Sequence, residues 1–289
     1  MSATTEPQVD TAVSLPDAGP DSTKGRRPRG DRQERKPSLA LRIGLPTAVG
    51  IVLLLLWELI SAKHLVSDLL IPPVDKTWDA LQAGLIDGDW WGDISTTLLE
   101  MVIGFAIGVV AGLLLGALFA HSPISRIAFY PYVIALQAFP KIAVAPLLVV
   151  ALGYGMSPKI AVAASLAYFP VMTAAIAGFT EIDADEHNFM RSINASRWQE
   201  MRYLRLPNAM SYLFPSFDVA LIVALLGAVA AELVGSQNGL GYILVQAQAM
   251  GDTPAIFADL IVLALLGVVL QAIIVLIRRL LPQSIVPRR

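Results

Sequence analysis

Long uncharged apolar runs, separated by short polar loops, dominate the chain from residue 41 onward. Runs such as MVIGFAIGVVAGLLLGALFA and LIVLALLGVVLQAIIVLI are long enough to cross a bilayer, whose hydrocarbon core takes about twenty apolar residues as a helix. Such segments are expected to be helical because lipid offers no partner for an open backbone. The pattern predicts six spans, near residues 41–60, 95–120, 127–152, 158–179, 212–236 and 256–277.

Lysine and arginine are unevenly shared between the two sets of loops that six spans create. They gather before the first span, between the fourth and fifth spans and after the last one, whereas the first loop on the other side is rich in aspartate. Loops rich in Lys and Arg near spanning helices stay in the cytoplasm. The sequence therefore predicts an all-α, polytopic membrane protein with six transmembrane helices and cytoplasmic N and C termini.

Composition separates the first forty residues from the rest of the chain. Residues 1–40 are rich in Pro, Gly, Ser and charge and have almost nothing apolar to bury, as is typical of disordered segments. The whole chain is nevertheless 55% hydrophobic and only 15% charged, whereas soluble domains hold about a quarter charged residues. We expect a disordered cytoplasmic tail over residues 1–40 and a transmembrane domain over residues 41–289.

Few residues of the chain suit metal binding or nucleophilic catalysis. There is no cysteine, the only histidines are His64, His121 and His187, and neither HExxH nor GxSxG occurs. These absences disfavour a metal site and an intramembrane enzyme. The phosphate-binding pattern GxxxxGK[ST] is also missing, so nucleotide is expected to bind elsewhere. An ion-coupled secondary transporter or channel without an ATPase stays open as one function of such a membrane protein.

Small residues recur every fourth position in two of the predicted spans. The second span carries such a row of four glycines, Gly104, Gly108, Gly112 and Gly116. Residues four apart stack on one helix face, and small ones let a neighbouring backbone approach closely. Packing within the subunit is favoured over a dimer contact. The fifth span has a row of alanines, at 220, 224 and 228, that leads to Glu232.

The loop over residues 180–208 is polar and has its own helix signals. Ile182, Phe189 and Ile193 lie on one side of a predicted amphipathic helix. Asn194 suits the left-handed conformation that ends a helix. Ser196 and Gln199 have the spacing of a capping box, which starts a second helix, and Pro207 is expected to end it. The loop could lie on the lipid surface or dock a partner protein.

The spacing within this loop resembles the permease subunits of bacterial ABC importers. Their cytoplasmic EAA loop has the pattern Glu-Ala-Ala, three residues, Gly, nine residues, Ile, one residue, Leu-Pro. Leu206-Pro207 matches the Leu-Pro, which places Leu204 on the Ile and Asn194 on the Gly. The triplet Asn188–Met190 then stands where the family has Glu-Ala-Ala. GAVAAELVGSQNGLGYIL, IPPVDKTWDAL and FPKIAVAPLLVVALGYG also resemble the nitrate, sulfonate and taurine permease subfamily.

The resemblance implies a type I ABC importer permease in the bacterial inner membrane and no enzymatic activity of its own. Its expected partners are a dimer of ABC ATPase subunits, a second permease copy, preferably identical, an extracytoplasmic solute-binding protein and membrane lipid, but no nucleic acid. ATP and Mg²⁺ would be bound by the partner ATPase, and this chain would hold no cofactor or metal. The predicted ATPase-coupling residues are Glu186, Phe189, Met190, Arg191, Asn194, Ala195, Arg197, Leu206 and Pro207.

Placing a charged residue inside a membrane span costs free energy, so charged residues in the predicted spans are candidates for a function. Lys141 and Glu232 are candidates for the path of a small, anionic solute such as a sulfonate, nitrate or taurine. Alternatively, Lys141 forms a structural ion pair with Glu232 or Glu100, or extends its amine to the interface. Four other carboxylates are expected to be solvated near span ends: Glu58, Glu100, Asp218 and Asp259.

Overall fold

A computed structural model describes residues 39–63, 65–88 and 90–280, with side chains described from residue 44 onward. Residues 1–38 of the predicted tail lie outside the described residues. The chain divides into two compact units, residues 1–51 and residues 52–289. The described part of the chain is helical and contains no strand. Apart from helical residues 39–51, the features discussed below lie in the larger unit.

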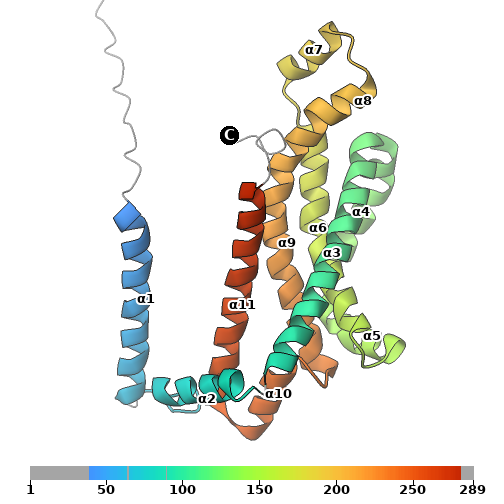
Figure 1. Cartoon of the computed structure of the whole chain (residues 1–289). Helices are drawn as coiled ribbons and strands as arrows, with labels where there is room; N and C mark the ends of the chain where they lie inside the picture. Colours follow the sequence, from blue (N-terminus) through green and yellow to red (C-terminus); the bar gives the residue numbers. More distant parts are fainter. Residues whose placement is uncertain (1–38, 64, 89, 281–289) are drawn as a thin grey trace, which may run out of the picture. The chain divides into compact units, whose positions relative to one another are not determined.

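The helices follow one another in a simple order, joined mostly by short connections (Figure 1). In chain order they are α1 (Leu39–Ala62), α2 (Val74–Ile86), α3 (Trp91–His121), α4 (Pro123–Ala138), the 3₁₀ turn η1 (Lys141–Val144), α5 (Ala145–Leu152), α6 (Ser157–Thr180), α7 (Ala184–Ser192), α8 (Arg197–Glu200), the π turn η2 (Met201–Arg205), α9 (Leu206–Gly235), α10 (Leu240–Met250) and α11 (Thr253–Leu280).

Five of the described helical segments are long and apolar enough to cross a membrane. The predicted span over residues 127–152 is interrupted, because α4 and the η1–α5 segment are bent by 78° at a short break. Phe139 is extended there, with φ −70° and ψ 133°, and Pro140 follows it. A residue before proline avoids the helical region, and proline offers no N–H. The number of spans reaches six only if this bent pair counts as one.

The core of the larger unit forms where α3 packs along α6, and α6 along α9. The glycine row of α3 faces α6 of the same chain. A Cβ atom added at Gly104 would lie 2.5 Å from the Ala163 Cβ, and one at Gly116 would lie 2.5 Å from the Ala175 Cβ. Ala220, Ala224 and Ala228 of α9 are fully buried. Small residues on all three helices therefore let their backbones approach closely.

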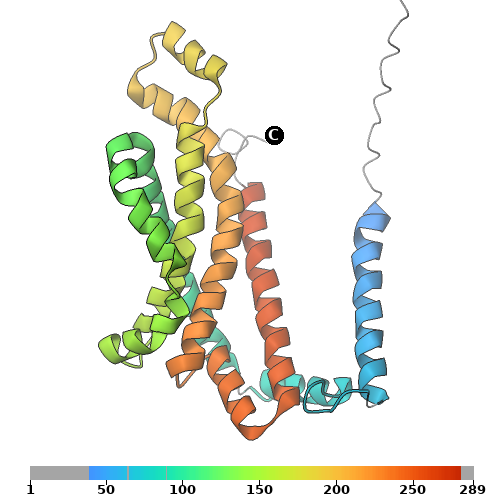
Figure 2. The same cartoon turned by 180° about the vertical axis from the view of Figure 1, so that it is seen from behind.

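Two shorter helices lie at the end of the bundle opposite to α7 and α8 (Figure 2). α2 packs against α11, and α10 is folded back between α9 and α11. Gly239 precedes α10 with φ +108°, and Gly251 ends it with φ +69°. Both conformations favour glycine, because it has no Cβ. The two glycines allow the chain to reverse twice within a short segment.

Candidate functional site

The loop between α6 and α9 has two helices, α7 and α8, that extend beyond the ends of the long helices (Figures 1 and 2). Asp183 begins α7 by accepting a hydrogen bond of 2.8 Å from the backbone N–H of Asp185. After α7, Asn194 has φ +52°, and among the described residues it is the one non-glycine residue with positive φ. The Ala195 N–H then donates to the Met190 carbonyl at 3.0 Å. The predicted break at Asn194 is confirmed.

The second helix of this loop begins with the predicted capping box. The Ser196 hydroxyl accepts from the Gln199 N–H at 3.3 Å, and the Gln199 side chain accepts from the Ser196 N–H at 2.7 Å. These two bonds satisfy backbone donors that a helix N-terminus otherwise leaves free. The start of α8 is therefore determined by local sequence.

The prediction that Pro207 ends this helix is wrong. The chain continues from α8 through the π turn η2 into α9, with Pro207 in the first turn of α9. The Leu206 N–H donates to the Met201 carbonyl, five residues back. Proline lacks an N–H, and its ring clashes with the preceding turn, so it disrupts the backbone hydrogen bonds of an α-helix. The wider π turn accommodates proline without ending the helix. α8, η2 and α9 thus form one continuous helical path.

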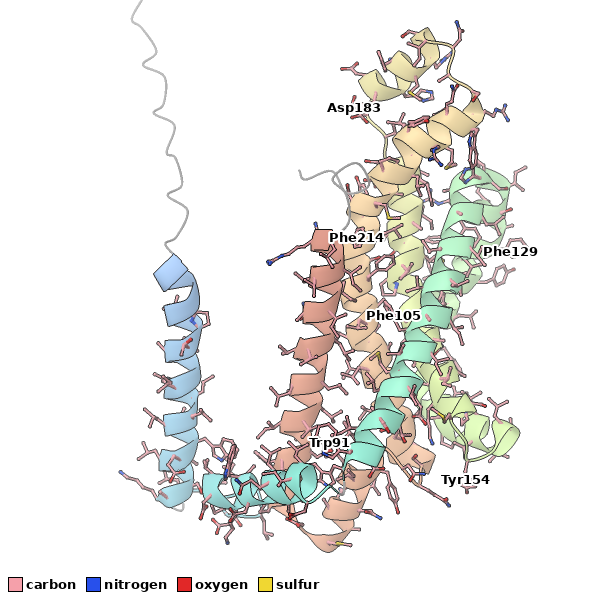
Figure 3. The ribbon with its side chains drawn as sticks, in the orientation of Figure 1. Trp91, Phe105, Phe129, Tyr154, Asp183 and Phe214 are labelled. Carbon is pink, nitrogen blue, oxygen red and sulfur yellow. The ribbon has the colours of Figure 1, made fainter. Side chains whose placement is uncertain are left out.

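The loop exposes apolar side chains that no other described part of the chain covers. Phe189 is 62% exposed and Trp198 is 71% exposed. The predicted coupling residues are mostly accessible: Glu186, Phe189, Arg191, Asn194, Arg197 and Leu206 are exposed, whereas Met190, Ala195 and Pro207 are half-buried. Asp183, at the start of α7, lies at the opposite end of the bundle from Trp91 (Figure 3). The loop therefore forms one extremity of the larger unit.

Two polar side chains that sequence reasoning missed join the base of the loop to α6. The Arg205 Nη1 atom donates to the Phe179 carbonyl at 3.0 Å, and the same guanidinium bonds the Glu200 carboxylate. The Asn208 amide donates to the carbonyls of Gly178 and Glu181, each at 2.8 Å. Their position on either side of Leu206-Pro207 is visible in the sequence, but their acceptors lie 26 to 30 residues away.

Lys141 is half-buried in η1, and its partner differs from both predicted ones. Among the described residues its amine donates to the Gln137 amide oxygen and lies 5.6 Å from the Tyr168 ring centroid, rather than pairing with Glu232 or Glu100. It lines a pocket of about 350 Å³ between α4, η1, α5 and α6, together with apolar side chains and Ser165. A cation beside an aromatic ring and a hydroxyl in an apolar pocket can hold a small anion.

Glu232 does not line that pocket. It is 1% exposed, and its carboxylate accepts from the Thr97 hydroxyl at 2.6 Å and from the Gly241 N–H at 2.7 Å. The Gly241 N–H belongs to the first turn of α10, where a carboxylate is favourable. The contacts of Glu232 therefore connect α3, α9 and α10.

Two of the carboxylates that were expected to be solvated are fully buried, so that prediction is wrong for Glu100 and Asp259. The Glu100 carboxylate lies 3.5 Å from the amine of Lys159, which is 3% exposed. The small residues of α3 and α6 bring the two backbones close together beside this pair, which leaves both charged side chains buried. Only Glu58 of the four is exposed at the surface, and Asp218 is half-buried.

Comparisons with known proteins agree with one another. A probable ABC transporter permease protein of Haemophilus influenzae is 30% identical over 78% of this chain and 91% of its own length. The riboflavin transport system permease protein RibX of Chloroflexus aurantiacus is 32% identical over 83% of this chain and 89% of its own. The putative aliphatic sulfonates transport permease protein SsuC of Bacillus subtilis is 27% identical over 79% of this chain and 83% of its own length.

The fold is also similar to that of a solved structure. A chain of the MetNI methionine ABC transporter, in an inward-facing conformation, aligns with a TM-score of 0.52 and 22% identity over 65% of this chain and 92% of that one. The family described as binding-protein-dependent transport system inner membrane component matches residues 108–287. This chain therefore belongs to that family and is a multi-pass, non-enzymatic permease subunit of an ABC importer, which works with a separate ATPase.

Proposed function

We propose that this permease carries a small anionic organic solute and that its ATPase docks on the loop formed by α7 and α8. One observation carries the docking proposal: a capped, helical loop at one extremity of the bundle exposes Phe189 and Trp198 to solvent. Large apolar side chains on a polar surface mark interaction sites. Local hydrogen bonds on both sides of Asn194 keep the loop stiff enough to transmit a displacement.

The loop is proposed to face the cytoplasm, where ATP is present. Six arginines lie in or after α7 on this loop or at the same end of α11: Arg191, Arg197, Arg202, Arg205, Arg278 and Arg279. The opposite end carries the exposed aspartates 75, 79 and 87 in or beside α2. This distribution follows the positive-inside rule. The chain would lie in a bacterial inner membrane, with its solute-binding protein on the side of α2 and α10.

The pocket beside Lys141 is the proposed part of the solute path. It opens between the bent pair α4 and η1–α5 on one side and α6 on the other. An ammonium group in an apolar surrounding favours an anion, such as a sulfonate, taurine or nitrate, over a neutral solute of the same size. The sulfonate relative supports this class. Glu232 is not part of the proposed path, because the contacts described above bury its carboxylate.

The proposed assembly contains two copies of this chain and two ATPase subunits, which would bind ATP and Mg²⁺. The chain itself is proposed to hold no cofactor. In such an assembly, nucleotide-driven closure of the ATPase pair would move the two loops and reopen the path to the other side. The coupling residues proposed at the contact are the exposed ones on and between α7 and α8: Glu186, Phe189, Arg191, Asn194 and Arg197.

Docking is tested by co-purifying the full chain with its partner ABC ATPase. Phe189→Asp should abolish co-purification and solute-stimulated ATP hydrolysis, because a buried carboxylate without a partner disrupts an apolar contact. Ala184→Asp is the matched control: it places the same carboxylate in the first turn of the same helix, where acidic groups are favourable. Retained assembly and coupled hydrolysis in Phe189→Asp would refute the docking site.

A further inference from the structure

The base of the α7–α8 loop is closed by side chains that bridge its two ends. We propose that Arg205 and Asn208 are positioning residues that make the loop, α6 and α9 move as one body, so that force applied to the loop reaches both spans. We call the set Gly178, Phe179, Glu200, Arg205 and Asn208 the neck clamp. This inference rests on the proposed docking of the ATPase, and it assigns the transmission of force to residues outside the docking surface.

Arg205 makes the central connection of the neck clamp. Its Nε and Nη2 atoms donate to the same Glu200 oxygen, at 2.9 and 2.7 Å, and its Nη1 atom donates to the Phe179 carbonyl at 3.0 Å. Glu200 ends α8, and Phe179 belongs to the last turn of α6. One rigid, planar guanidinium thus joins the loop helix to a membrane helix that precedes it by 26 residues.

The acceptors on α6 are groups that a helix end leaves unsatisfied. The last four carbonyls of a helix have no partner within it. Arg205 donates a hydrogen bond to the carbonyl of Phe179. The Asn208 amide donates to the carbonyl of Gly178 and to the carbonyl of Glu181, just beyond the helix. The C-terminal end of α6 is therefore capped by the two residues on either side of Leu206-Pro207.

Backbone contact reinforces the neck clamp at the same level. A Cβ atom added at Gly178 would lie 2.5 Å from the Ala209 Cα atom. Here α6 and α9 touch through their backbones, and no side chain separates them. Because this contact leaves no room for sliding, the capping bonds and the packed backbones hold the two spans in one register.

The covalent connection alone does not couple the loop to α6. Between α6 and α7 the chain runs through Glu181–Asp183, whose end residues are extended or irregular, with ψ 79° at Glu181 and ψ 134° at Asp183. Such a short non-helical link can absorb a displacement. On the other side, α8 continues into α9 through the π turn. Without the neck clamp, a push on the loop would therefore reach α9 directly, and α6 only through its packing against α9.

The test compares variants in the full permease–ATPase complex, reconstituted in liposomes with its solute-binding protein. Arg205→Met keeps an aliphatic side chain but removes the guanidinium group and its hydrogen bonds. The ratio of solute imported to ATP hydrolysed should therefore fall about tenfold. Arg205→Lys should recover the ratio only in part, because one ammonium cannot reach both acceptors. Arg202→Met is the matched control, because it removes another arginine of the same π turn. Among the described residues Arg202 contacts the Tyr203 ring and makes no hydrogen bond to α6, so its loss should leave the ratio unchanged.

A second variant covers the case in which Arg205→Met does not fold. Asn208→Leu removes both amide bonds to α6 without changing charge, and it should lower the same ratio. Unchanged ratios in both folded variants overturn the inference. Loss of assembly with the ATPase in either folded variant also overturns it, because the neck clamp would then serve docking.

A spectroscopic measurement separates the neck clamp from the docking proposal. The chain has no cysteine, so spin labels can be placed at Ser157→Cys, at the start of α6, and Ser192→Cys, at the end of α7. In the permease alone, the distance distribution between the labels should be narrow, and it should broaden in Arg205→Met but not in Arg202→Met. An equally narrow distribution in Arg205→Met overturns the neck clamp even if the ATPase docks on the loop. Broadening without ATPase docking retains the clamp and rejects only the docking site.

Discussion

The Thr97 hydroxyl of α3 donates a 2.6 Å hydrogen bond to the buried Glu232 carboxylate of α9, 135 residues further along the chain. The same hydroxyl accepts from the Leu240 N–H at 2.8 Å, at the first residue of α10. Asp93 of α3 accepts from the Gly239 N–H at 2.6 Å. The first N–H groups of α10, which a helix leaves free, are therefore satisfied by α3 and α9.

Replacing Thr97 with valine tests this arrangement with almost no change in side-chain shape. We expect a loss of about 1–3 kcal/mol in the free energy of unfolding, because the Leu240 N–H and the Glu232 carboxylate lose a buried partner. Thr97→Ser keeps the hydroxyl and should lose much less. The stabilities of the two variants and the parent are compared by thermal unfolding of the purified chain in detergent. Equal stability of Thr97→Val and the parent would contradict the proposed contribution of the Thr97 hydrogen bonds.

Because Glu100 and Lys159 form a buried pair, we expect mutations of the two residues to have strongly non-additive effects on the free energy of unfolding. Lys159→Met should cost about 3–5 kcal/mol, because it leaves a carboxylate buried without its opposite charge. Adding Glu100→Gln to Lys159→Met should restore most of the lost stability, since no charge then remains to be compensated. The four variants of the cycle are compared by the same unfolding measurement. Additive losses in the double variant would show that the two side chains do not interact.

The glycine row of α3 predicts a reversal of the usual effect of alanine. Glycine to alanine in a helix normally stabilises by about 0.8–1 kcal/mol. At Gly108 a Cβ atom would lie 2.7 Å from the Ala167 Cβ, so Gly108→Ala should instead destabilise by about 1–3 kcal/mol. Gly92→Ala in the same helix, where no atom lies within 4 Å of the added Cβ, is the control and should be neutral or stabilising. Stabilisation by both changes would contradict the close contact with α6.

Removing the charge of Lys141 should impair transport of an anionic solute while leaving assembly intact. Lys141→Gln is expected to lower import at subsaturating solute about tenfold, as for the loss of a charge-assisted hydrogen bond. Lys141→Arg keeps the positive charge and should retain most of the import. Uptake into liposomes containing the complete transporter measures both. Normal import by Lys141→Gln would exclude Lys141 from the solute path.

The features that sequence reasoning predicted correctly depend on residues close together in the chain. The left-handed conformation of Asn194 and the capping box of Ser196 and Gln199 each involve a few neighbouring residues. At Pro207 the same local reasoning failed, because the helix end expected there does not occur. The chain breaks and bends by 78° after Phe139, whereas at Pro207 a π turn preserves the helix. Proline removes a hydrogen bond in both places, but the surrounding packing decides how the backbone compensates.

Sequence alone determined which segments are apolar enough to cross a membrane and where the polar loop with its caps begins. Hydrophobicity and capping depend on the residues themselves and their nearest neighbours, so they can be read directly. Only the tertiary structure decided that Glu232 meets Thr97, that Lys159 rather than Lys141 meets Glu100, and that Arg205 closes the base of the loop. These contacts join helices distant in sequence, and their partners depend on how small residues bring the helix backbones together.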